Sequence, residues 1–140
     1  MSKVAVVYWS GTGNTEAMAN AVAAGAKDAG AEVSVFTASE FDAGKAAEFG
    51  AIAFGCPSMG VEQLEESEFE PMFDEVKGSL GGKKVGLFGS YGWGDGEWMR
   101  TWESSCRDAG INLVSEGVIC NEAPDDEAEG NCRELGKSLA

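Results

Sequence analysis

Short apolar runs alternate with helical patterns along the whole chain, and this alternation is the strongest constraint on its fold. The runs KVAVVY (Lys3–Tyr8) and AIAFG (Ala51–Gly55) are apolar at nearly every position. A strand in a sheet with one face in water would instead alternate apolar and polar residues. Continuous apolar strands are typical of a parallel sheet that helices cover on both faces. The pattern therefore predicts a three-layer α/β domain.

The remaining elements follow in the order that such a domain requires. Three further strands are predicted at 32–37, 83–90 and 111–120. Helices are predicted at 15–28, 69–76, 97–108 and 125–139. The segment ASEFDAGKAAEF, at 38–49, is a weaker crossover with only a turn or two of helix.

Length and cysteine usage narrow the class of protein. A chain of 140 residues fits one domain, 1–140. No apolar run reaches the roughly 18 residues that span a bilayer, and the N-terminal apolar stretch is too short for a secretory signal, so we expect a cytoplasmic protein.

The four cysteines form no C-x-x-C pair, and the chain has no histidine to complete a zinc set. We therefore expect no metal site, and buried or incidental thiols at Cys56, Cys106, Cys120 and Cys132.

The charge of the chain is strongly one-sided. Its 24 acidic and 10 basic residues give a formal net charge of -14. Such a field repels nucleic acid and anionic lipid, and it speeds encounter with basic protein surfaces. Acidity that only maintains solubility is the alternative interpretation.

A polar, glycine-containing segment, SGTGNT at 10–15, lies between the first strand and the first helix. It lacks the lysine of a Walker A loop, and Gly11 and Gly13 do not continue into a G-x-G-x-x-G fingerprint, which disfavours nucleoside triphosphates and NAD. Its hydroxyls, its amide and the N–H groups of a helix N-terminus suit a phosphate monoester. A Ser or Thr N-cap on a tight turn is the plainer alternative.

Two other phosphate chemistries are excluded by residue type. A low-molecular-weight phosphatase needs a cysteine nucleophile and an arginine in this loop, and neither is present. A response-regulator receiver needs an acidic phospho-acceptor at the end of the third strand, where this chain has GCPSMG, at 55–60.

Two more glycine-rich turns follow the third and fourth strands. GCPSMGVEQ carries Met59, and GSYGWGDGEW carries Tyr91 and Trp93. The carboxyl ends of parallel strands share one edge, so these groups are expected beside the phosphate loop. A phosphate clamp with apolar groups on two sides suits a phosphorylated planar cofactor, although ordinary packing is an open alternative for Met59.

The motifs YWSGTGNTEAMAN, GCPSMG, EESEFEP, GKKVGLFGSYGWGDGEWM and NEAPDDEAE together resemble the short-chain flavodoxins of anaerobic bacteria. The resemblance covers essentially the whole chain, and the block SYGWGDGEW gives it specificity. It implies a flavodoxin-like fold, a doubly wound sheet of five parallel strands in the order 2-1-3-4-5. It also implies a low-potential one-electron carrier that is not an enzyme, with non-covalently bound FMN cycling between quinone, semiquinone and hydroquinone.

The resemblance implies partners and a cofactor site as well. The protein would be a monomer that meets basic-surfaced redox proteins, donors and acceptors of the ferredoxin-using kind. Segment 10–15 would hold the phosphate, with a hydroxyl from Ser90. Trp93 and Met59 would cover the two flavin faces, Glu62 would accept from flavin N3–H, and Asn121 would lie near the ribityl chain. The complete set is Ser10, Gly11, Thr12, Gly13, Asn14, Thr15, Ser58, Met59, Gly60, Val61, Glu62, Ser90, Tyr91, Gly92, Trp93, Gly94 and Asn121.

Val61 departs from the family pattern, in which a small polar or acidic residue follows the loop glycine, here Gly60. A type II turn over residues 59–62 needs a positive φ at Val61, which a β-branched residue resists, whereas type II′ needs it at Gly60. We expect Val61 to bias this turn.

Two other functions compete with electron transfer. A flavin enzyme of related fold, such as a quinone reductase, would need a pocket for nicotinamide and substrate, and Trp93 is expected to cover that face. An FMN-binding regulatory module is the third alternative.

Overall fold

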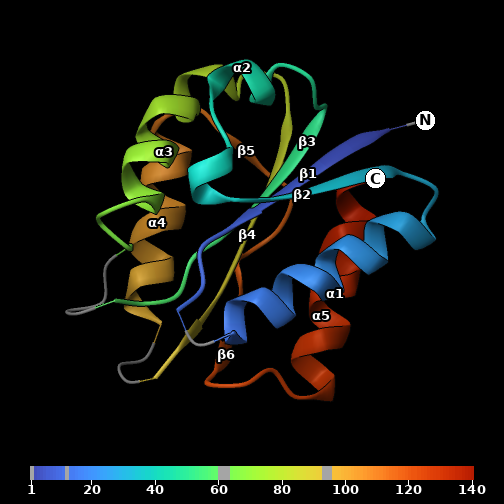
Figure 1. The fold of residues 1–140 in the computed structure, drawn as a ribbon, viewed down its shortest axis with the longest axis vertical. Coiled ribbons are helices and arrows are strands. Elements are labelled where there is room, and N and C mark those ends of the chain that lie inside the picture. Colours follow the sequence, from blue (N-terminus) through green and yellow to red (C-terminus); the bar gives the residue numbers. More distant parts are fainter. Residues whose placement is uncertain (1, 12, 60–63, 93–95) are drawn as a thin grey trace.

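One sheet of parallel strands forms the middle layer of the computed structural model, which describes residues 2–11, 13–59, 64–92 and 96–140 (Figure 1). The order β2-β1-β3-β4-β5, with β6 also paired to β4, confirms the predicted topology. All the strand pairings are parallel. The strands are β1 (Lys3–Tyr8), β2 (Glu32–Thr37), β3 (Ala51–Gly55), β4 (Lys84–Tyr91), β5 (Asn112–Leu113) and β6 (Val118–Asn121).

The last predicted strand, 111–120, is divided into two segments along the same edge of β4. β5 pairs with the start of β4, and β6 pairs with its end. A Cβ atom on Gly117 would lie 2.4 Å from Met99 Sδ, so the chain passes close to a neighbouring helix at the break. The Gly117 N–H donates to the Glu103 carboxylate of that helix at 2.5 Å, and not to a strand. Contacts from the helix that directly precedes this strand in the sequence therefore interrupt it.

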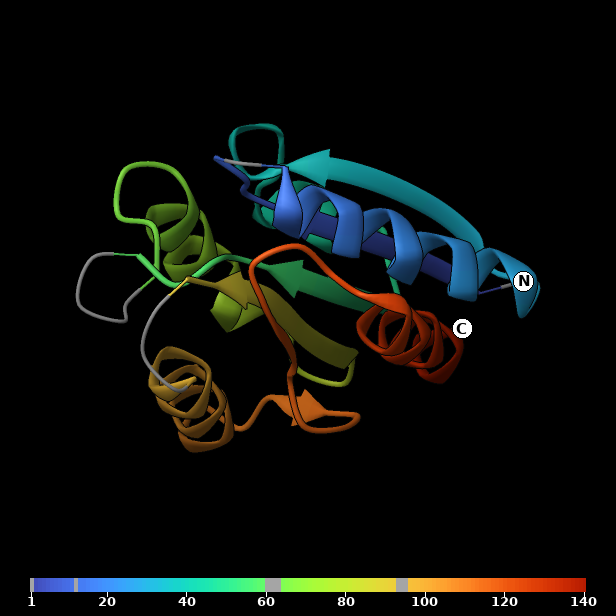
Figure 2. The same ribbon diagram turned by 90° about the horizontal axis from the view of Figure 1, so that it is seen from below.

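Helices cover both faces of the sheet (Figures 1 and 2). The pair α1 and α5 packs closely because glycines face the partner backbone: a Cβ on Gly25 would lie 2.0 Å from Arg133 O. The opposite face carries α3 and α4, with short 3-10 turns at Ala38–Glu40 and Lys77–Ser79. The helices are α1 (Asn14–Asp28), α2 (Ala43–Ala46), α3 (Phe69–Val76), α4 (Glu97–Asp108) and α5 (Asp126–Leu139).

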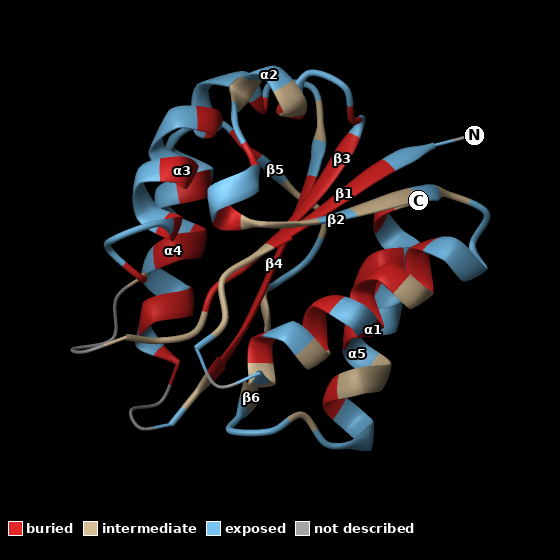
Figure 3. Ribbon diagram, viewed as in Figure 1, coloured by how far each residue is buried: buried red, intermediate tan, exposed pale blue. Residues whose placement is uncertain are grey.

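The two helical layers give the protein two apolar cores. On β1, Val4 and Val6 belong to the core under α1 and α5, whereas Ala5 and Val7 belong to the core under α3 and α4. All five residues of β3 are buried, and Figure 3 shows burial along most of β1, β3 and β4. Burial on both faces explains why these strands are continuously apolar, as the sequence predicted.

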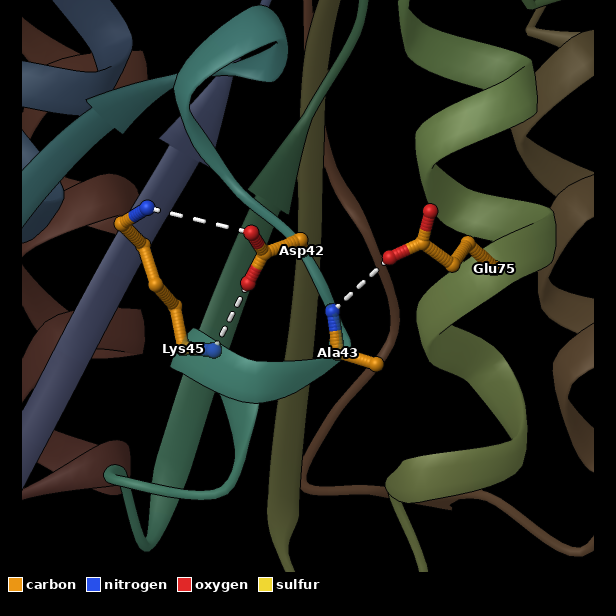
Figure 4. A network of polar contacts seen from close by, with 4 residues as sticks. All are labelled: Asp42, Ala43, Lys45 and Glu75. Carbon is orange, nitrogen blue, oxygen red and sulfur yellow. Dashed lines mark hydrogen bonds and ion pairs between the residues drawn. The ribbon is translucent and has the colours of Figure 1, made fainter.

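The weak crossover predicted at 38–49 is a 3-10 turn followed by α2. Asp42 caps this helix by accepting the Lys45 N–H at 2.8 Å, and its second oxygen lies 3.9 Å from Lys45 Nζ (Figure 4). The Glu75 carboxylate of α3 accepts the Ala43 N–H at 3.0 Å. Side chains from two elements therefore hold a helix that is too short to be stable alone.

The described residues also address the expectations for membranes and cysteines. Among the described residues, none of the helices has the length and apolar character of a membrane span. All four cysteines are free thiols, and Cys56, Cys106 and Cys132 are buried while Cys120 is half-buried.

Candidate functional site

A cavity of about 410 Å³ lies beyond the carboxyl ends of β1, β3, β4 and β6. The chain leaves β1 and β3 in opposite directions across the sheet, and ligands in doubly wound folds bind at this reversal of strand order. Four connections therefore contribute to the walls. The lining residues are Trp9, Gly11, Asn14, Pro57, Ser58, Met59, Ser90, Tyr91, Gly92 and Glu122.

The first wall is the start of α1, which no side chain of the described residues caps. The N-cap residue is Gly13, in the left-handed conformation with φ of 92°. The hydroxyl of Ser10 turns back within the loop and accepts the Gly13 N–H at 3.0 Å. The N-cap is therefore a glycine and not the Ser or Thr of the alternative interpretation, and the first N–H groups of the helix have no acceptor among the described residues.

Thr15 supplies a further donor in the first turn of α1. Its side chain is only 1% exposed, and its hydroxyl oxygen has no hydrogen-bond partner among the described residues. A buried polar group left unpaired costs about 1–3 kcal/mol. An oxyanion placed at the helix N-terminus would supply the missing acceptor, so this part of the site fits a phosphate group.

The second wall is the connection after β3, and the third is the end of β4 with the connection that follows it. Backbone hydrogen bonds hold these two walls together beyond the end of β3. The Cys56 N–H donates to Phe88 O at 3.1 Å, and the Ser58 N–H donates to Ser90 O at 3.0 Å. These bonds extend the β3–β4 pairing and carry the half-buried Met59 to the cavity beside Tyr91.

A buried carboxylate anchors the far end of the connection after β3. Glu65 is 5% exposed, and its oxygens accept the backbone N–H groups of Ser67, Glu68 and Phe69 at 2.7–2.9 Å. The Ser67 hydroxyl donates to the same carboxylate. Burial alone would raise the pKa of Glu65, but these hydrogen bonds outweigh it and lower the pKa to about 2. Glu65 therefore stays ionised and holds the start of α3.

The fourth wall is a strained turn after β6. Glu122 has a φ of 58°, a conformation that non-glycine residues rarely adopt. Its N–H donates to Tyr91 O at 2.8 Å, and its carbonyl accepts the Ser90 hydroxyl at 2.6 Å. The amide of Asn121 also donates to Tyr91 O, at 3.3 Å. The hydroxyl proton of Ser90 is thus directed at Glu122 and not at the loop after β1.

The structure gathers most of the described residues that the sequence indicated. Ser10 and Gly13 line an adjoining hollow of about 380 Å³, Thr15 lies buried in the first turn of α1, and Asn121 contacts the wall through Tyr91. Seven others line the main cavity: Gly11, Asn14, Ser58, Met59, Ser90, Tyr91 and Gly92. The predictions for Thr12, Gly60, Val61, Glu62, Trp93 and Gly94 lie outside the described residues.

Three lining residues were not assigned from the sequence: Trp9, Pro57 and Glu122. Trp9 lies against Gly11, on which a Cβ would approach its ring to 3.1 Å, and its indole N–H donates to Glu68 at 3.1 Å. The position of Trp9 directly before segment 10–15 could have indicated that this residue borders the site. The turn at Glu122 had no signal, because glutamate seldom adopts a positive φ.

Comparisons with known proteins agree on one family. The family model described as Flavodoxin matches residues 6–136. The chain is 48% identical to a flavodoxin of Megasphaera elsdenii over 137 residues, 98% of each chain. It is 46% identical to a flavodoxin of Clostridium beijerinckii over 135 residues, 96% of this chain and 97% of the relative.

Solved structures lead to the same family. The solution structure of two-electron reduced Megasphaera elsdenii flavodoxin superposes with a TM-score of 0.89, at 48% identity and over 97% of each chain. A flavodoxin from the domain Archaea gives a TM-score of 0.88 at 30% identity, over 99% of this chain and 96% of that one.

The buried carboxylate predicts a specific dependence of stability on pH. The pKa of Glu65 is lower in the folded protein than its ordinary value of 4.5, so its contribution is complete above that value. The contribution, about 3 kcal/mol, is lost as pH falls from about 4.5 towards 2. Urea unfolding should show Glu65→Gln less stable than wild type by this amount at pH 7, with the gap closing at low pH.

The exposed carboxylate of Glu48 provides the control. Glu48→Gln should change the free energy of unfolding by less than about 0.5 kcal/mol. A Glu65→Gln deficit that stays constant from pH 7 to pH 2.5 would contradict the ionised anchor.

Proposed function

The chain belongs to the flavodoxin family, and we propose that the cavity at the carboxyl ends of β1, β3, β4 and β6 is its FMN site. The protein is an FMN-binding electron carrier without substrate turnover of its own. Bound FMN supplies a group that takes up and releases single electrons at low potential. The observation that carries the assignment of the site is the unpaired, buried hydroxyl of Thr15 at the uncapped start of α1.

Neutral donors would hold the phosphate in this site. The open N–H groups of the first turn of α1, the Thr15 hydroxyl and the Asn14 amide provide hydrogen bonds, and the helix dipole adds a positive potential. Neither lysine nor arginine occurs in segment 10–15. Thr12 belongs to the proposed set by its place in the sequence.

Apolar and acidic groups would adjust the environment of the flavin ring. Met59, Tyr91 and Trp9 provide apolar surface in the cavity, and Trp93 is proposed as an additional cover. Surfaces of this kind exclude water and disfavour added negative charge. Glu122 also lines the cavity, and each carboxylate about 10 Å away opposes a further negative charge by about 0.4–1.7 kcal/mol. Gly60, Val61, Glu62 and Gly94 complete the proposed contacts.

The protein transfers electrons to redox partners, and we propose that these partners present basic surfaces and include donors and acceptors of the ferredoxin-using kind. The net charge of -14 supports this, as do the exposed carboxylates of α3 and its flank, Glu66, Glu68, Glu70, Asp74 and Glu75. We further propose one domain over residues 1–140, acting as a monomer in the cytoplasm.

Thr15→Val tests the site, because it removes only the unpaired hydroxyl. The apoprotein should unfold with a free energy equal to or about 1–2 kcal/mol above wild type, since a buried orphan donor is lost. The dissociation constant for FMN should rise about 10- to 100-fold, since a hydrogen bond to a charged group is worth about 1.5–3 kcal/mol. Urea unfolding and titration of FMN fluorescence provide the two measurements.

Thr101→Val, at an exposed position of α4, is the matched control and should leave FMN affinity unchanged. Wild-type affinity in Thr15→Val would remove the phosphate assignment. A loss of apoprotein stability would show that the hydroxyl is paired within the protein.

The proposed partners predict a salt dependence. Electron transfer to a ferredoxin-dependent reductase with a basic docking surface should slow severalfold as ionic strength rises from about 10 mM to 300 mM, because salt screens the attraction. Anaerobic stopped-flow absorbance measures this rate. A rate constant that does not change over this range would refute charge-steered docking.

A further inference from the structure

An indole hydrogen bond links the connection after β3, which forms the second wall of the cavity, to the helix that follows the third wall. Trp98, in the first turn of α4, donates its Nε1–H to the carbonyl of Cys56 at 3.2 Å. Cys56 is the first residue after β3, and α4 is the helix that the connection after β4 enters. Both residues are buried, with exposures of 0% for Cys56 and 2% for Trp98. A bond in this position fixes one connection relative to the other.

Gly89 of β4 provides the space for this bond. A Cβ atom at Gly89 would lie 2.2 Å from the Cys56 carbonyl oxygen and 3.2 Å from Cζ2 of Trp98. No larger residue could stand there without moving the carbonyl or the indole. The strand therefore carries its smallest residue where the carbonyl and the ring meet.

The same two residues also reach the parts of the connections that border the cavity. The ring of Trp98 packs against the ring of Tyr91, with centroids 5.5 Å apart. The Sγ atom of Cys56 accepts the N–H of Glu65, at the far end of the connection after β3, at 3.3 Å. Trp98 is thus joined to one wall through Tyr91 and to the other through Cys56, while it does not line the cavity itself.

We propose that Trp98 is a positioning residue that sets the spacing between the Met59 wall and the Tyr91 wall of the cofactor cavity. The inference rests on the proposed FMN site, because the spacing matters only if a planar ring enters between these walls. Trp98 acts through Cys56 and Tyr91 and makes no contact with the cofactor.

The chain offers a closely matched comparison one turn further along α4. Trp102 is 3% exposed and sits in the same apolar core, but its Nε1–H has no partner among the described residues. Trp98→Phe and Trp102→Phe make the same chemical change in the same helix. The first removes the donor of the hydrogen bond to the Cys56 carbonyl, whereas the second removes a donor that has no hydrogen-bond partner among the described residues.

The test begins with the apoprotein, by amide hydrogen exchange. In Trp98→Phe the amides of Ser58 and Glu65 should exchange about tenfold faster, because the connection that they close has lost its link to α4. Amides in the middle of β1 should keep wild-type rates. Trp102→Phe should leave all of these amides unchanged.

The test then uses the FMN-loaded proteins. Trp98→Phe should raise the dissociation constant for FMN about tenfold, equal to about 1.4 kcal/mol. It should also change the visible circular dichroism of bound FMN, which reports on the surroundings of the ring. Gly89→Ala, which keeps the indole but places a methyl group between it and the carbonyl, should reproduce both effects.

Equal effects of Trp98→Phe and Trp102→Phe, or faster exchange throughout the core, would overturn the proposal, because packing alone would explain them. Unchanged FMN affinity and circular dichroism in Trp98→Phe would overturn it as well. Failure of the wild-type protein to bind FMN would refute the proposed site instead, and the exchange arm distinguishes that failure because it needs no cofactor.

Discussion

Burial of the sheet on both faces is the constraint on which the rest of the structure depends. A strand with helices above and below must be apolar throughout, and its neighbours must be reached by crossovers that return the chain in the same direction. All carboxyl ends then emerge at one edge, where the loops cannot be buried and are free to carry function. In this chain the connections after β1, β3, β4 and β6 meet there around one cavity.

One part of the proposed cavity would anchor the cofactor, and other parts would adjust its redox potential. At the start of α1, the first N–H groups and the Thr15 hydroxyl have no acceptor among the described residues, so an anion can accept their hydrogen bonds. Segment 10–15 contains no lysine or arginine. Elsewhere the walls include the apolar Met59 and Tyr91 and the acidic Glu122, and the whole chain carries a formal net charge of -14. A phosphate is therefore attracted locally by neutral donors, whereas extra charge on the ring is opposed by its surroundings.

Sequence patterns predicted the strands whose ends depend on their own residues, but not the features that depend on contacts with other elements. The bounds of β1, β2 and β3 agree with the sequence, because their apolar runs end at glycine, charged or polar residues. The division of the last strand was not predictable, since it depends on Met99 and Glu103 of another helix. The positive φ of Glu122 and the Trp98–Cys56 bond likewise arise from tertiary contacts.

Comparison of FMN with riboflavin tests the central claim most directly, because riboflavin has the same ring system and lacks only the phosphate. Calorimetric titration of the apoprotein with each ligand would measure the contribution of the loop at residues 10–15. If several charge-assisted hydrogen bonds hold the phosphate, FMN should bind at least about 1,000-fold more tightly than riboflavin. Affinities within a few-fold of each other would contradict a cofactor anchored by its phosphate.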